Sequence, residues 1–335
     1  MPKYRKAPAE AGAAAADGGD AEAPAADEAG AAGSERRSIA VDAAAHGGRL
    51  DKLLVALAPE FSRSWLQTLV RDGHVRVDGQ ACTVPARRLR AGQQVELELV
   101  PTAESRAFTP QPMALAIVHE DEHLLVLDKP AALVVHPAAG NWSGTLLNGL
   151  LAHHAGAAAL PRAGIVHRLD KDTSGLMVVG KTPAAVTALV RAIAAREVQR
   201  RYRALAHGAV APAEQAVDAP IGRDPASRLR MAVRAGGKPA RTDVRCLRVR
   251  AGVSALECTL HTGRTHQIRV HLAHLGHPLL ADRLYGGTPA LGMQRQALHA
   301  FALALRHPAG GAPLAFEAAP PPDFAAAWAQ VMAGA

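Results

Sequence analysis

Between residues 164 and 181 the sequence places five ionisable side chains directly in front of an apolar run. The ionisable residues are His167, Arg168, Asp170, Lys171 and Asp172. Residues 176–179 then read Leu-Met-Val-Val between two glycines, which predicts a strand buried on both faces. A solvated loop with local ion pairs is the alternative, but such a loop rarely needs so many ionisable groups. We therefore expect a loop that presents a carboxylate at the mouth of a sheet.

The same segment contains a match to the phosphate-binding P-loop pattern. Residues 175–182 satisfy G-x-x-x-x-G-K-[ST], and a hydrophobic stretch ending in Asp128 imitates the strand that accompanies such a loop. A P-loop is a flexible turn whose backbone amides wrap a phosphate, and its strand comes before it. Here the four middle positions favour the strand itself, and Asp128 precedes the supposed loop instead of following it. We therefore reject a nucleotide-binding interpretation.

The charge of the chain indicates a polyanionic partner. Its 335 residues include 38 Lys and Arg against 30 Asp and Glu, a formal net charge of +8. Residues 1–33 hold three of the basic and six of the acidic residues, so residues 34–335 carry 35 against 24, a net charge of +11. A basic globular body most often binds nucleic acid, although an ordinary enzyme can also be basic. With only 3% aromatic residues, it is not expected to stack bases on a broad aromatic platform.

Other features exclude several classes of protein. The three cysteines form no C-x-x-C pair, which argues against a disulfide scaffold and a cysteine zinc site. The sequence has no run of about 18 apolar residues and no secretory hydrophobic segment. We expect a soluble cytoplasmic protein without membrane contact, acting as a monomer with no obligate protein partner.

Composition and periodicity divide the chain into three parts. Residues 1–37 are mainly Ala, Gly, Pro and acidic residues without apolar periodicity, which predicts a disordered tail. Residues 38–105 predict a small module of two helices followed by short strands. Leucines recur there at helical spacing, and a segment in which apolar and polar residues alternate follows them. Residues 106–335 predict a larger domain of mixed type. Its predicted strands lie at residues 115–118, 124–127, 176–179, 197–206, 240–247 and 254–260, and its helices at 183–195 and 268–275.

The module at residues 38–105 resembles the S4 RNA-binding domain. Residues 49–51 (Arg-Leu-Asp) and 62–64 (Ser-Arg-Ser) stand where that family has its R-L-D and S-R-S/T elements. The resemblance implies an RNA-binding role for Arg49, Lys52, Arg63 and Ser64. A small scaffold with solvated arginines is the alternative.

A second dense segment, residues 262–277, contains four histidines that invite a metal-binding interpretation. No carboxylate has H-E-x-x-H spacing to them, and His271, His274 and His277 spread around a helix instead of converging. We therefore expect no metal site. Arg264 follows a glycine at a predicted strand end, where it is well placed to pair with an active-site carboxylate.

Three motifs together resemble the RluA-type pseudouridine synthases. They are His-Arg-Leu-Asp-Lys-Asp-Thr-Ser-Gly from residue 167, Arg-Tyr-Arg-Ala-Leu from residue 201 and Thr-Gly-Arg-Thr-His-Gln-Ile-Arg-Val-His from residue 262. With the preceding S4-like module, the chain is most similar to the subgroup named pseudouridine synthase D, which acts on a hairpin of 23S ribosomal RNA. The acidic tail and a short segment after Gly287 depart from the family pattern. The implied fold class is α+β, an S4-type module followed by a mixed, largely antiparallel catalytic sheet with flanking helices.

The resemblance also implies the site. Asp170 would be the catalytic carboxylate beside the sugar carbon C1′ and the uracil ring, and Arg264 would keep it ionised and oriented. Tyr202 would stack on the uracil, and Arg168 would act as a wedge or phosphate contact for a flipped nucleotide. The isomerisation needs no cofactor or metal. A ribosome assembly factor that binds RNA without catalysis is the alternative function.

Overall fold

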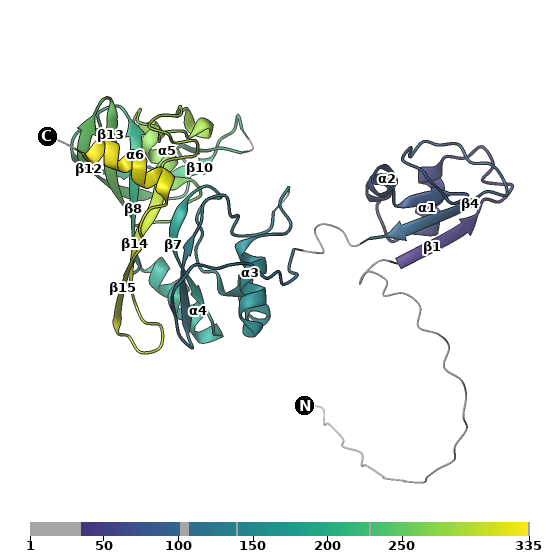
Figure 1. Cartoon of the computed structure of the whole chain (residues 1–335), viewed down its shortest axis with the longest axis horizontal. Helices are drawn as coiled ribbons and strands as arrows, with labels where there is room; N and C mark the ends of the chain where they lie inside the picture. Colours follow the sequence, from purple (N-terminus) through teal and green to yellow (C-terminus); the bar gives the residue numbers. More distant parts are fainter. Residues whose placement is uncertain (1–34, 101–106, 139, 228, 334–335) are drawn as a thin grey trace, which may run out of the picture. The chain divides into compact units, whose positions relative to one another are not determined.

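The computed structural model describes residues 35–100, 107–138, 140–227 and 229–333 (Figure 1). The chain divides between Pro101 and Thr102 into two compact units. The disorder predicted for residues 1–34 lies outside the described residues. Strand β1 (Glu35–Ala40), however, begins inside the segment that we assigned to the tail, so the predicted boundary at residue 37 is too late. No helix in the described part of the chain is long and apolar enough to cross a membrane.

The N-terminal unit is an antiparallel four-stranded sheet that shares one core with two helices. The sheet has the order β1-β4-β2-β3, with β2 at Val75–Val77, β3 at Gln80–Ala81 and β4 at Gln94–Leu99. Leucines of α1 (Leu50–Leu57) and α2 (Arg63–Arg71) pack with the inward valines of β2 and β4. Ser62 caps α2 by accepting a hydrogen bond from the backbone N–H of Trp65, as its sequence position predicts. The predicted pair of helices and the short strands after it are confirmed.

A buried carboxylate organises the surface of this helix pair. Asp51 is fully buried in the first turn of α1. Arg49 donates to both of its oxygens, at 3.0 and 2.9 Å, and Arg63 and Gln67 donate to Oδ2 at 2.8 and 2.7 Å. The Arg49 hydrogen bonds hold the pKa of Asp51 below its usual value against the opposing effect of burial. Two of the predicted RNA-binding arginines therefore also hold the module together.

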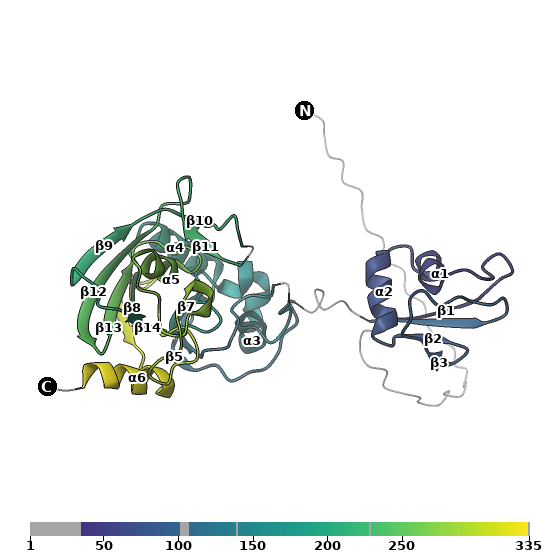
Figure 2. The ribbon, with the colours of Figure 1, turned by 90° about the horizontal axis from the view of Figure 1, so that it is seen from above.

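The larger unit is built on a nine-stranded mixed sheet. Its order is β5-β6-β7-β14-β8-β13-β12-β9, with β15 also paired to β14. Figure 2 shows the part of this sheet from β9 to β7. All neighbours are antiparallel except β7 and β14. The strands are β5 (Ile117–Glu120), β6 (Leu124–Lys129), β7 (Ser174–Gly180), β8 (Gln199–His207), β9 (Glu214–Asp218), β12 (Arg241–Arg250), β13 (Val253–Leu260), β14 (Leu298–Arg306) and β15 (Pro313–Glu317). A separate two-stranded sheet pairs β10 (Ile221–Arg223) with β11 (Met231–Val233). The predicted α+β class is confirmed, although the strand predicted at 115–118 begins two residues later.

Helices cover both faces of the large sheet, which explains why β7 is buried along its whole length. On β6 and β7, α4 (Pro183–Ala194) packs on one face and α3 (Leu146–His153) on the other. On β8 and β13, α5 (Gln267–His274) packs on one face, and α6 (Pro322–Met332) packs on the other (Figure 1). Three short 3-10 helices complete the unit, at Ala155–Ala159, Pro161–Gly164 and Arg283–Tyr285. Residues 175–180 belong to strand β7 and do not form a turn, which agrees with the rejection of a P-loop.

The Asp51 cluster predicts a specific change in stability. We expect Asp51→Asn to lower the free energy of unfolding of the N-terminal unit by about 2 kcal/mol, since several charge-assisted hydrogen bonds are weakened together. The pKa of Asp51 is lowered in the folded state, so the difference from wild type should be fully present above about pH 4 and shrink as the pH falls further. Urea unfolding of the full chain, monitored by hydrogen exchange in residues 50–71, measures this difference in free energy. The matched control is Asp72→Asn, at an exposed position at the end of α2, which should change the free energy of unfolding little.

Candidate active site

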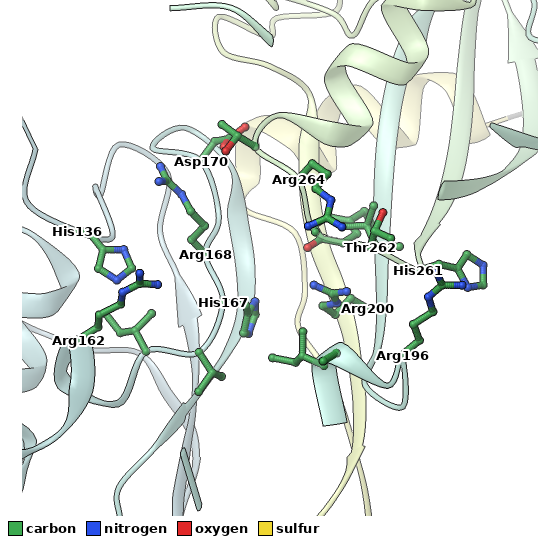
Figure 3. Close-up of a pocket in the computed structure, with 18 residues that line it drawn as sticks. His136, Arg162, His167, Arg168, Asp170, Arg196, Arg200, His261, Thr262 and Arg264 are labelled. Atoms are coloured by element: carbon green, nitrogen blue, oxygen red, sulfur yellow. The ribbon is translucent and has the colours of Figure 1, made fainter. Parts of the chain in front are cut away.

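One pocket of the larger unit brings together all four residues predicted for the active site. The cavity measures about 430 Å³, and Arg168, Asp170, Tyr202 and Arg264 all line it. They come from the loop before β7, from β8 and from the loop after β13 (Figure 3). In Figure 3, Arg168 and Asp170 lie on one side of the pocket and Arg264 on the other. Asp170 is the only carboxylate in a lining that also contains five arginines.

Two cations, one of them fully buried, hold the backbone of the Asp170 loop. Lys129 at the end of β6 is fully buried, and its ammonium donates to the carbonyl oxygens of Pro130, Leu133 and Lys171. Burial lowers the pKa of Lys129 to about 8, although nearby carboxylates oppose the shift. Arg295 donates to the carbonyl oxygen of Asp172 at 2.8 Å. The residues on the C-terminal side of Asp170 are therefore fixed from two directions.

Gly175 allows the strand behind this loop to take its place. Its φ is +118°, and a Cβ atom at this position would lie 2.2 Å from the carbonyl oxygen of Ala300 on β14. Only glycine lets the parallel strands β7 and β14 approach this closely. The glycine of the first motif is thus explained by strand packing and not by phosphate binding.

The partner of Asp170 is Arg269, which corrects the prediction that Arg264 would hold it. Arg269 on α5 donates from Nη1 to Asp170 Oδ2 at 3.0 Å, and from Nε and Nη2 to the two oxygens of Asp282 at 2.7 and 2.8 Å. Burial lowers the pKa of Arg269, but its hydrogen bonds to Asp282 and the charge of Asp170 outweigh that effect, so the pKa is raised. Arg264 precedes the helix, and its Nε donates to the carbonyl oxygen of Pro239 at 2.9 Å.

A histidine and a tyrosine complete this cluster. His266 Nε2 lies 3.8 Å from Asp170 Oδ1, and His266 Nδ1 lies 2.8 Å from the hydroxyl of Tyr285. That hydroxyl accepts a hydrogen bond from the backbone N–H of Met231, so the ring of Tyr285 is anchored on the small sheet. Burial lowers the pKa of His266, which favours the neutral imidazole. His266 also has a left-handed backbone conformation, with φ 56°, at the start of α5.

Tyr202 forms another part of the pocket wall. It lies on β8 opposite Cys258 of β13, and only 4% of its surface is exposed. Burial raises the pKa of its hydroxyl, and the charge of Asp170 acts in the same direction, whereas Arg200 opposes it. The hydroxyl is therefore protonated at neutral pH. A buried ring beside the carboxylate is suited to pack against a planar base.

Sequence reasoning missed Arg269, His266, Asp282 and Tyr285 as parts of one cluster. The apolar neighbours Ile268 and Val270 favour partial burial of Arg269 in the predicted helix, but the spacing does not show which carboxylate would be its partner. Metal binding finds no support in the described residues, which contain no cluster of three or more candidate ligands. His271, for example, hydrogen-bonds Thr242 and the carbonyl oxygen of Ala219.

Comparisons with known proteins identify the family. A model described as "RNA pseudouridylate synthase" matches residues 123–274, and an S4 domain model matches residues 48–95. The ribosomal large subunit pseudouridine synthase D of Neisseria meningitidis serogroup B is 50% identical over 291 residues, covering 83% of this chain and 77% of the relative. The chain belongs to the RNA pseudouridylate synthase family. The relative of the same name from Xanthomonas campestris is 47% identical, covering 86% of this chain and 90% of the relative.

A solved structure agrees with this assignment. Human RNA pseudouridylate synthase domain containing 1 matches with a TM-score of 0.51 and 28% identity, covering 69% of this chain and 90% of the human chain. As a family member, the chain is an enzyme that converts uridine to pseudouridine, and its N-terminal unit is an S4 domain. The predicted family and both predicted kinds of domain are thereby confirmed.

The two candidate partners of Asp170 can be told apart by kinetics. Arg269→Lys should lower the single-turnover rate of the synthase by at least about 10²-fold at saturating RNA, because a lysine cannot bind both oxygens of Asp282 and still orient Asp170. RNA affinity should change little, since Arg269 is 6% exposed. Arg264→Lys, which leaves that ion cluster intact, should reduce the single-turnover rate less than Arg269→Lys does. A milder effect at Arg269 than at Arg264 would contradict the pairing.

Proposed function

We propose that the enzyme isomerises specific uridines in large-subunit ribosomal RNA, with Asp170 as the catalytic carboxylate and without a cofactor. The observation that carries the proposal is the pocket in which Asp170 is the only acidic residue, fixed by Arg269 and accompanied by the buried Tyr202. The choice of RNA is supported by relatives of 45 to 50% identity that are named ribosomal large subunit pseudouridine synthase D.

The reaction breaks the bond between C1′ of the ribose and N1 of the uracil, and forms a bond between C1′ and C5. The proton on C5 is lost, and N1 gains one, so no electrons are exchanged with an outside group. An ionised carboxylate beside C1′ can attack that carbon or assist loss of the base. The hydrogen bond from Arg269 holds one oxygen of Asp170 in place, and the same side chain lines the pocket, where a flipped nucleotide would lie.

The S4 domain supplies affinity for the same RNA in this proposal. Lys52 is exposed, and its ammonium makes no hydrogen bond or ion pair with the other described residues, so its charge is available to a phosphate. Arg49 and Arg63 bind Asp51, yet 37% and 48% of their side chains remain exposed. Ser64 lies beside them at the start of α2, with its hydroxyl 3.0 Å from that of Ser62. Changing both arginines to alanine would remove folding contacts as well as phosphate contacts, so Lys52 is the cleaner probe of RNA binding.

The catalytic assignment predicts the outcome of a single isosteric change. Asp170→Asn should lower pseudouridine formation by at least ~10³-fold and leave RNA binding nearly intact, because the amide keeps the shape but carries no negative charge. Single-turnover assays on a 23S ribosomal RNA hairpin measure the rate. Carbodiimide labelling detects the product, since pseudouridine and uridine have the same mass.

Asp172→Asn is the internal control. Asp172 lies two residues further along the same loop, where its carbonyl oxygen, and not its carboxylate, binds Arg295. This variant should keep measurable turnover. Retained activity in Asp170→Asn would refute the assignment, and loss only in Asp172→Asn would show that the other carboxylate is the catalytic one.

A further inference from the structure

Arg200 is a buried cation that pairs with none of the described residues. It lies on β8, two residues before Tyr202, and only 5% of its surface is exposed. Its Nε is buried and has no hydrogen-bond acceptor. Among the described residues, none forms a hydrogen bond or ion pair with its guanidinium, and no aromatic ring lies against it. Gly263 leaves space for this group, because a Cβ there would lie 2.9 Å from Arg200 Nη1.

The other buried arginine of this unit has two acidic partners, and two less buried arginines have one each. Arg269 binds Asp282 and Asp170, Arg201 binds Glu257, and Arg295 binds Asp323. A guanidinium stays charged at every physiological pH, and burying an unpaired charge is strongly unfavourable. The position of Arg200 therefore indicates an anion that arrives with a ligand.

His167 supplies a second unpartnered donor in the same pocket. Its Nε2 accepts a hydrogen bond from the backbone N–H of Val178 at 3.0 Å, so the proton of the neutral ring is on Nδ1. Nδ1 is buried and has no partner in the described structure. Burial lowers the pKa of His167 to about 3, and the charge of Arg200 contributes to the shift. In Figure 3 the two residues face each other across the lower part of the pocket.

The rest of the lining selects for negative charge. Arg162 and Arg196 also line this pocket, on the sides of His167 and of Arg200 respectively (Figure 3). Burial lowers the pKa of His136 to about 4, so this histidine is neutral at pH 7 and does not add to the positive charge. A neutral uracil ring could accept hydrogen bonds from these donors, but it could not offset the charge of Arg200. A phosphate can, because its oxygens match the planar donor array of arginine.

We propose that Arg200 and His167 bind a phosphodiester group of the RNA strand, adjacent to the nucleotide whose uracil reaches Tyr202. This inference rests on the proposed function, and it names the part of the RNA substrate that binds beside Arg200 and His167. Residues two apart on a strand lie on the same face at a separation of about 6.6 Å. Arg200 and Tyr202 can therefore contact the backbone and the base of one nucleotide.

Substitution by methionine separates this role from a structural one. Arg200→Met should leave the melting temperature of the RNA-free enzyme unchanged or raise it, because it removes a buried unpaired charge. The same variant should bind a 23S ribosomal RNA hairpin about 10- to 100-fold more weakly. The slope of the logarithm of its binding constant against the logarithm of the salt concentration should be smaller in magnitude by about 0.7 to 0.9. Arg201→Met is the control: it lies on the opposite face of β8 and binds Glu257, so its RNA affinity should stay within a few-fold.

A neutral methylphosphonate in the RNA, placed on either side of the target uridine, identifies the phosphate. At one of the two positions it should weaken wild-type binding as much as Arg200→Met does, and it should cause no further loss in that variant. Independent, additive losses at both positions would overturn the proposal, as would a lower melting temperature with unchanged affinity. If the wild-type enzyme forms no pseudouridine in any large-subunit RNA, the proposed function fails instead, and the binding measurements still report on Arg200.

Discussion

The ion cluster of Asp170, Arg269 and Asp282 is the interaction on which the larger unit depends. Arg269 is almost completely buried, and its charge would be strongly unfavourable there without acidic partners. Asp282 takes two of its donors and fixes the plane of the guanidinium, and a third donor then reaches Asp170. The carboxylate of Asp170 thereby gains one orientation. The sheet, α5 and the segment around Asp282 meet at this point.

The N-terminal unit uses the same principle with the charges reversed. There a buried carboxylate, Asp51, is held by Arg49 and Arg63, whereas a buried arginine is held by two carboxylates in the catalytic unit. In both places the buried ion fixes at least one side chain that remains partly accessible, Arg49 and Arg63 in the first unit and Asp170 in the second. Arg200 differs from both, because its counter-charge is missing from the described structure.

The sequence predicted the parts of this site that depend on local pattern. An apolar run between glycines predicts the buried strand β7, and the charged loop before it predicts the place of Asp170. The choice between Arg264 and Arg269 could not be made in the same way. It depends on where α5 begins, and His266 starts that helix with a left-handed backbone that no periodicity reveals. Tyr285 and Asp282 reach the cluster only through tertiary packing, so their partners could not be predicted from spacing.

The central claim is that Asp170, oriented by Arg269, lies against the reacting sugar carbon of the target uridine. A structure of the Asp170→Asn enzyme bound to a 23S ribosomal RNA hairpin tests it most directly. The account predicts a flipped uridine in the pocket of Figure 3, with C1′ about 3 to 3.5 Å from the side chain at position 170 and its base against Tyr202. Arg269 should still bind Asp282. A uridine bound elsewhere, or a C1′ atom far beyond contact distance from position 170, would contradict the account.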